Sequence, residues 1–227
     1  MPEIKPAVME ALCGLVVHDL RNPAATLGAN LSFVREVIDD EGASREEIGE
    51  ALADAQQALH DLMRGLDQLS WIGRWSNEKG AAGTSLESLT ATFARLKERV
   101  KYGSIAIEPP SAELRVRGGE ALERLLDLLV ANGHQHAPRT LVQVRAVREG
   151  DRAVVEVIDK GKPLAPGLSE QAFSLEGQTA VKGRSEGRYS RVAGLFTASI
   201  LAKTLGAELD AIERDGHNVF RVSLALI

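Results

Sequence analysis

Several features are scarce in this chain of 227 residues, and each scarcity excludes a class of protein. The only cysteine is Cys13, so no disulfide can form within the chain, which suits a reducing cytoplasm. The longest apolar runs, at 12–17 and 192–202, fall short of the roughly 18 residues that a membrane-spanning helix needs. Residues 1–6 lack the apolar core of a signal peptide. We therefore expect a soluble cytoplasmic protein that makes no membrane contact.

Basic charge is also in short supply. The formal net charge is -5, and aromatic residues make up 4% of the sequence. A nucleic-acid surface needs a surplus of Lys and Arg to neutralise phosphates, so nucleic acid is excluded as a general partner. Hydrophobic residues make up 44%, which is enough for a packed core in one large or two small domains.

The first third of the sequence predicts two amphipathic helices. Apolar residues recur at spacings of three, four and seven over 5–40, and again from Ile48 to Leu69. Between them, Ser44 and Glu47 form a capping-box pattern. A hairpin of two such helices has one apolar face left over, so we expect two copies to pair into a four-helix bundle, as a homodimer.

The remainder of the sequence predicts a second domain of a different kind. Residues 71–84 contain Gly, Ser and charge and indicate a linker, placed at 76–84 between a domain at 1–75 and another at 85–227. Helical patterns are expected at 85–100, 120–136 and 194–205, the last ended by Gly206. Strands are expected at 104–107, 113–116, 141–147, 153–158, 207–213 and 218–225. Together these elements predict an α+β protein, a helical hairpin followed by an α/β sandwich.

The stretch His18–Pro23, His-Asp-Leu-Arg-Asn-Pro, concentrates chemistry in the first helix. Neutral imidazole is a nucleophile near pH 7, and the carboxylate of Asp19 can raise its basicity or take its proton. Asn22 lies one turn on and can reach the same space. Pro23 costs the helix roughly 3 kcal/mol and is expected to bend it. These parts fit a phosphoryl acceptor, although a lone His is more often a structural side chain.

His18–Pro23 resembles the H-box of the bacterial two-component histidine kinases. The resemblance implies that His18 is phosphorylated, that Asp19 acts as the base, and that Asn22 positions water in a phosphatase reaction. It also implies that the second domain is an α/β sandwich of the histidine-kinase ATPase type.

Residues 128–138 resemble the N-box of the same family. The resemblance implies that Asn132 binds Mg²⁺ beside the phosphates, and an amide oxygen suits this hard cation. Leu128 stands where the family often has a second Asn or an acid, and Gln135 where it usually has Lys or Arg. Without the resemblance, Asn132 fits equally well as a turn residue at a helix end.

Residues 157–166 resemble the first glycine box, which implies that Asp159 and Gly161 hold the adenine of ATP. Lys162 replaces the next glycine of the family. An Asp in a turn after a strand is the alternative interpretation of Asp159.

The second glycine box would fall on 190–195, where Gly194 and Leu195 agree with the family. The resemblance implies that Gly194 contributes to phosphate binding. Basic residues precede this stretch and can contact either a triphosphate or an acidic partner; they are Lys182, Arg184, Arg188 and Arg191.

Taken together, the resemblance implies a soluble histidine kinase without a sensor domain. It would phosphorylate His18 from Mg-ATP and pass the group to the receiver domain of a response regulator, with a separate sensor protein supplying the input. Two alternatives stay open. One is a histidine phosphotransferase with a degenerate, non-ATP-binding domain that relays phosphoryl between receivers, and the other is a pseudokinase that only binds a partner.

Overall fold

The structure is a computed structural model that describes residues 6–39, 44–77, 85–100, 103–137, 140–161, 173–174 and 193–227. The chain forms two compact units. One comprises Met1–Asn77 with Gly187–Ala193, and the other Glu78–Glu186 with Gly194–Ile227. Each unit is described below by itself.

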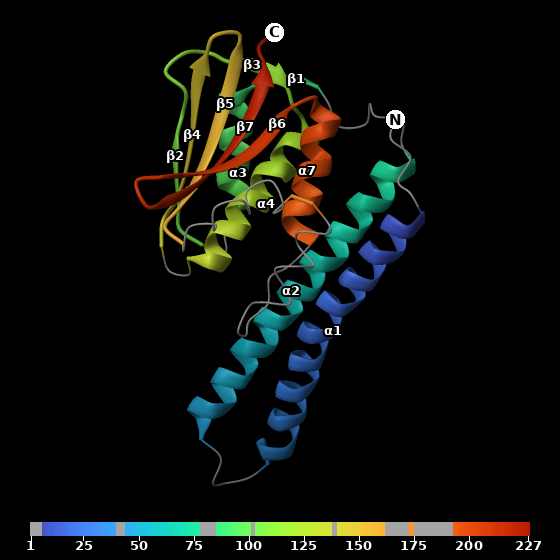
Figure 1. Ribbon diagram of the computed structural model, residues 1–227. Coiled ribbons are helices and arrows are strands. Elements are labelled where there is room, and N and C mark those ends of the chain that lie inside the picture. Colours follow the sequence, from blue (N-terminus) through green and yellow to red (C-terminus); the bar gives the residue numbers. More distant parts are fainter. Residues whose placement is uncertain are drawn as a thin grey trace. The chain divides into compact units, whose positions relative to one another are not determined.

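The first unit is a hairpin of two long antiparallel helices (Figure 1), α1 (Pro6–Val37) and α2 (Arg45–Asn77). The expected cap of the second helix is present, because Ser44 Oγ accepts hydrogen bonds from the backbone N–H groups of Glu46 at 3.2 Å and Glu47 at 3.4 Å. Residues 71–77, whose composition indicates a linker, belong to α2; of these, only 76–77 were placed in the linker. Extending an existing helix adds one hydrogen bond per residue, which outweighs a single glycine in this stretch. Residues 78–84 lie outside the described residues.

The hairpin buries small side chains and leaves large ones exposed. Ala51, Ala55 and Ala58 of α2 are buried, as is Val34 of α1. Four of the larger apolar residues of α2 are exposed; they are Leu52, Leu59, Met63 and Leu66. Thus α2 uses an alanine-lined stripe inside the hairpin and presents a leucine-rich stripe outside it.

The second unit is built on a mixed five-stranded sheet in the order β2-β4-β5-β7-β6. Its strands are β2 (Ile105–Glu108), β4 (Val142–Glu149), β5 (Arg152–Asp159), β6 (Glu208–Arg214) and β7 (His217–Ala225). The β2 and β4 strands are parallel and the other neighbours are antiparallel. The β6–β7 turn contains Asp215 at φ 54° and Gly216 at φ 74°, the left-handed conformations that a two-residue hairpin turn requires.

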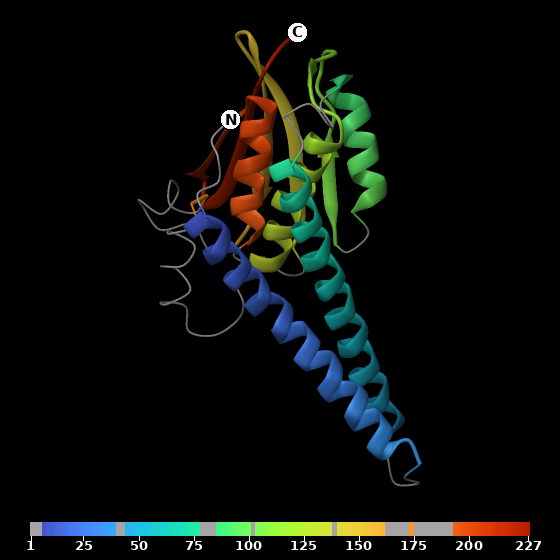
Figure 2. The same ribbon diagram turned by 90° about the vertical axis from the view of Figure 1, so that its right-hand side faces the viewer.

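Three helices cover one face of this sheet (Figures 1 and 2): α3 (Leu89–Arg99), α4 (Glu120–His136) and α7 (Ala193–Leu205). Under them lie the alternate, fully buried residues of β5 and β7, among them Val155, Val157 and Val222. Gly206, at φ 66°, ends α7 as expected, and the next N–H donates to the Ala202 carbonyl at 2.9 Å. The predicted α+β class, with a helical hairpin and a mixed sheet covered by helices, is confirmed.

One expected helix begins later than its sequence pattern indicates. Residues 86–88 form strand β1 (Leu86–Ser88), which pairs antiparallel with β3 (Arg115–Arg117), and α3 starts only at Leu89. The Glu87 carboxylate accepts a hydrogen bond from the Gly119 N–H at 2.5 Å, at the start of α4. These contacts join segments distant in sequence, so a local helical pattern does not show them.

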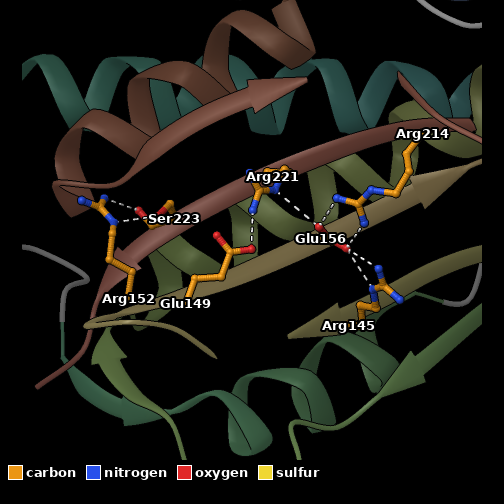
Figure 3. Close-up of polar contacts among 7 residues, drawn as sticks. All are labelled: Arg145, Glu149, Arg152, Glu156, Arg214, Arg221 and Ser223. Carbon is orange, nitrogen blue, oxygen red and sulfur yellow. Dashed lines mark hydrogen bonds and ion pairs between the residues drawn. The ribbon is translucent and has the colours of Figure 1, made fainter. Parts of the chain in front are cut away.

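The open face of the sheet carries a buried carboxylate held by arginines from three other strands of the sheet, β4, β6 and β7 (Figure 3). Glu156 on β5 is only 2% exposed. Arg145 Nε and Arg214 Nη1 donate to its Oε2 at 2.9 and 3.0 Å, and Arg214 Nη2 donates to Oε1 at 2.8 Å. Arg221 Nε lies 3.4 Å from Oε1. Burial by itself raises the pKa of Glu156, but the hydrogen bonds from Arg214 and Arg145 outweigh it and the pKa is lowered.

The same face continues this pairing across the whole sheet. The register sets Arg145 and Arg221 on either side of Glu156, with Glu108 opposite Arg145 and Asp210 opposite Arg221. Charge therefore alternates in sign along one row through all five strands, which favours this register over its neighbours.

Candidate functional site

The predicted phosphoacceptor positions lie within α1, which runs without interruption through Pro23. Asn22 and Pro23 are half-buried. The side chains of His18 and Asp19 lie outside the described residues, so the expected functions of His18, Asp19 and Asn22 stay predictions. The helix does show that these three positions fall within two successive turns of one element.

The predicted base-binding carboxylate ends strand β5. Asp159 is 1% exposed, and its Oδ1 accepts hydrogen bonds from the Gly161 N–H at 2.7 Å and from Asn218 Nδ2 at 3.0 Å. Its Oδ2 is buried and has no hydrogen-bond partner within the described part of the chain. A buried acceptor without a donor costs about 1–3 kcal/mol, so this atom fits a ligand that brings an N–H group.

Close approach of a helix completes this part of the site. Gly133 follows Asn132 in α4, and a Cβ at Gly133 would lie 3.1 Å from Asp159 Cβ and 3.0 Å from Val142 Cγ2. Because glycine has no Cβ, the last turns of α4 pack directly on the ends of β4 and β5. The predicted residues Asn132, Asp159 and Gly161 are thus gathered at one end of the sheet, with Asn132 half-buried.

Two residues of this arrangement were not expected from the sequence. Gly133 carries the helix–sheet contact, and Asn218, near the start of β7, orients Asp159. Its amide fixes Oδ1 and thereby leaves Oδ2 as the oxygen open to a ligand. A signal existed for Asn218, since it occupies a buried position of a strand whose other helix-facing residues are apolar.

The positions predicted to contact phosphate lie partly outside the described residues. Gly194 is half-buried in the first turn of α7, and a Cβ there would meet no atom within 4 Å. Leu128 is 4% exposed, so an apolar side chain is buried at this position of α4. The Gln135 side chain lies outside the described residues, as do residues 162–172 and 175–192, which include Lys182, Arg184, Arg188 and Arg191.

Within the described ranges no cluster of three His, Cys, Asp or Glu residues could hold a metal ion. In nucleotide sites Mg²⁺ usually keeps several waters and takes further ligands from phosphate, and an amide oxygen such as that of Asn132 suits it. Among the same residues, no helix is long and apolar enough to cross a membrane.

Comparison of sequences relates the chain to histidine kinases, although no protein-family model matches it. It is 28% identical over 180 residues to the sensor protein KdpD of Mycobacterium tuberculosis, and 30% identical over 178 residues to the methanogenesis regulatory histidine kinase FilI of Methanothrix harundinacea. These matches cover 72% and 76% of this chain and 20% of each relative. The chain therefore spans about a fifth of the length of these curated relatives.

Solved structures share the fold at low sequence identity. The histidine kinase AdeS of Acinetobacter baumannii matches with a TM-score of 0.58 and 12% identity, over 92% of this chain and 98% of that one. The histidine kinase ThkA, solved with the response regulator TrrA, matches with a TM-score of 0.65 and 17% identity. The match covers 97% of this chain and 63% of the ThkA chain. Full-length ShkA, solved with AMPPNP, matches with a TM-score of 0.59 and 16% identity. The match covers 96% of this chain and 46% of the ShkA chain.

The fold and the relatives together define the class of this protein. The chain is related in sequence to sensor histidine kinases and shares the fold of the solved histidine kinases AdeS and ThkA. The resemblance to a histidine-kinase core is confirmed.

Proposed function

We propose that this chain is the kinase core of a two-component system. It would transfer the γ-phosphoryl group of Mg-ATP to His18 and then to an aspartate of a response-regulator receiver domain. The observation that carries the proposal is the buried Oδ2 of Asp159, which has no partner among the described residues and lies beside the Gly161 amide and close to Gly133 of α4. Support also comes from the sensor-kinase relatives, and from neighbours whose solved structures contain a nucleotide analogue or a response regulator.

Each residue of the base site has a specific task in this proposal. Asp159 Oδ2 accepts from the exocyclic amino group of adenine, while Asn218 and the Gly161 N–H hold Oδ1. Gly133 keeps α4 close enough for the base to be enclosed. Asn132 supplies an amide oxygen to Mg²⁺, and Gly194 contributes backbone N–H groups at the start of α7. Bound Mg²⁺ neutralises charge on the phosphates.

At the phosphoacceptor, a ring nitrogen of His18 attacks the γ-phosphorus. The P–N bond forms as the β–γ P–O bond breaks, ADP leaves, and Asp19 takes the imidazole proton. In-line positioning and charge neutralisation supply most of the catalysis in such transfers. Asn22 would position water when the phosphoryl group is hydrolysed.

The proposal includes a homodimer because the leucine-rich stripe of α2 has no cover within the hairpin. A second copy would bury it in a four-helix bundle, at about 25 cal/mol per Å² of apolar surface. Replacement of Leu59 and Leu66 by Glu is expected to give a monomer in light scattering after size exclusion. The matched control is Gln56→Glu, at an exposed position of the same helix, which should stay dimeric. A wild-type monomer at micromolar concentration would contradict this part.

The second candidate function is a histidine phosphotransferase without ATP use. The buried Leu128, at a position where the family often has Asn, favours it because an apolar side chain cannot assist Mg²⁺. His18 would then relay the phosphoryl group between two receivers, and the second unit would be a docking surface.

One experiment separates the two functions. The purified chain, His18→Ala and Asp159→Asn are incubated with γ-labelled Mg-ATP, and separately with a phosphorylated receiver. The kinase predicts label from ATP on the wild type and loss of it in both variants. The relay predicts no label from ATP but label from the receiver, lost only in His18→Ala. No label from either donor overturns both.

A further inference from the structure

The hairpin contains one glycine whose missing side chain is used by the facing helix. A Cβ at Gly65 in α2 would lie 2.5 Å from Cδ2 and 3.6 Å from Cγ of Leu20 in α1. Contacts below 3.0 Å are not tolerated by close-packed atoms, so Leu20 occupies the space that any other residue at 65 would fill. Both residues are half-buried.

Other glycines of the same two helices have no such neighbour. A Cβ at Gly28 in α1 or at Gly49 in α2 would meet nothing within 4 Å. Glycine inside a helix is unfavourable relative to alanine, so a glycine that accommodates another side chain differs from one that faces open space. Gly65 thus forms a seat for Leu20, whereas Gly28 and Gly49 do not form one.

Leu20, the residue that Gly65 accommodates, lies two positions after the predicted phosphoacceptor His18. At 3.6 residues per turn, position 18 lies about 200° around the axis of α1 from position 20. When Leu20 is seated against α2, the helix face that bears position 18 is turned away from α2. A large rotation of α1 about its axis would bring that face closer to α2.

We infer that Gly65 is a positioning residue for phosphoryl transfer, because its seat for Leu20 fixes the rotation of α1 that turns position 18 outward. The inference rests on the proposed function of His18. In Gly65→Ala the new Cβ would overlap Leu20 Cδ2, so Leu20 must move from the position that sets this rotation. A displacement of about 1 Å at a reacting group costs on the order of 10²-fold in rate, so a loss of about tenfold to a hundredfold in phosphorylation of His18 is expected.

The first test measures the orientation of His18 without any phosphoryl transfer. Carbethoxylation of His18 by diethyl pyrocarbonate is followed by peptide mass spectrometry and divided by that of His60, which is exposed on α2. The ratio is expected to fall several-fold in Gly65→Ala, to stay unchanged in the matched control Gly49→Ala, and to recover in Gly65→Ala/Leu20→Ala, where the smaller side chain needs no seat. Equal ratios for Gly65→Ala and Gly49→Ala, or no recovery in the double variant, would overturn the inference.

The second test measures transfer itself. Phosphorylation of His18 by phosphoramidate needs neither ATP nor a receiver, since the phosphoryl group leaves ammonia for the imidazole nitrogen. The rate should follow the carbethoxylation ratio across the four proteins. If the wild type accepts no phosphoryl group from any donor, the proposed function fails while the carbethoxylation ratio still decides on Gly65. If Gly65→Ala does not fold, the double variant Gly65→Ala/Leu20→Ala is compared with the wild type, and a lower ratio in the double variant overturns the inference.

Discussion

Two buried carboxylates lie three residues apart on strand β5 and face opposite sides of the sheet. Glu156, on the open face, has both oxygens engaged by Arg145, Arg214 and Arg221. Asp159, on the helix-covered face, has one oxygen held by two neutral donors and the other without a partner among the described residues. The two groups are almost equally buried, at 2% and 1% exposure, so burial does not distinguish them.

The difference lies in how completely each charge is compensated. A buried carboxylate with all acceptor positions satisfied stabilises the fold it belongs to, and its removal leaves cations behind. A buried carboxylate with one oxygen unsatisfied costs stability until a ligand donates to it. We therefore assign a structural role to Glu156 and propose a binding role for Asp159.

Glu156→Gln is expected to have the largest effect on stability. Breaking a buried ion pair costs about 3–5 kcal/mol, and because the three arginines are partly exposed and can be rehydrated, a loss of about 2–3 kcal/mol is expected. Urea unfolding measures it. The control is Glu149→Gln, whose carboxylate is 53% exposed and pairs with Arg221; it should cost less than about 1 kcal/mol. Equal losses in both variants would contradict a structural assignment of Glu156.

Asp159→Asn is expected to give the opposite pattern. The variant loses a charge-assisted hydrogen bond to the base, about 1.5–3 kcal/mol, which is about a 10- to 150-fold weaker affinity for Mg-ADP by calorimetry. Its free energy of unfolding should be unchanged or slightly higher, because an unsatisfied buried charge is removed. Inosine diphosphate, which lacks the amino group, is the matched ligand and should bind the wild type about as weakly as ADP binds the variant. A large stability loss without a change in affinity would make Asp159 structural too.

Gly133→Ala tests whether the close packing of α4 on Asp159 is needed. The new Cβ would lie 3.0 Å from Val142 Cγ2 and 3.1 Å from Asp159 Cβ, so these neighbours must shift by a few tenths of an ångström. Better helix propensity favours alanine by about 1 kcal/mol and overpacking opposes it by about 1–3 kcal/mol, leaving a net loss of about 1 kcal/mol. The affinity for ADP should also fall, because the new Cβ shifts Asp159. A variant with improved stability and full affinity would show that the close approach has no function.

Much of the sheet unit follows from local sequence signals. The helix at 120–136 has the predicted bounds, and Asp215 with Gly216 forms the turn that its residue types favour. Alternating patterns give the four long strands because the side of each that faces the helices is mostly apolar. Strand β1 was missed because its partner β3 lies far along the chain, and the linker was placed from residue 76 because residue type alone does not reveal where a helix stops.

The site follows the same division. Asp159, Gly161 and Asn132 lie in recognisable local motifs, so the sequence alone predicts them as site residues. Asn218 lies 59 residues from Asp159, and only the pairing of β5 with β7 brings the two side chains together. Glu156 was missed for the same reason, since its arginines come from three other strands.

The smallest expected effect concerns pH, and it sharpens the assignment of Glu156. Its pKa is lowered from an ordinary 4.5, so its contribution to stability is complete above that value and is lost as pH falls through the lower folded pKa. The difference in free energy of unfolding between the wild type and Glu156→Gln should therefore narrow on acidification from neutral pH to about pH 3. Asp210, at the end of the same row, is exposed, and its pKa is shifted the other way: loss of hydration raises the pKa from 3.8 and outweighs the attraction of Arg221, so ionisation of Asp210 slightly opposes folding. Asp210→Asn should be slightly more stable than the wild type at neutral pH, and this gain should vanish as pH falls. A parallel acid dependence of all three proteins in urea unfolding would show that the carboxylates of the open face do not act through the arginines around Glu156.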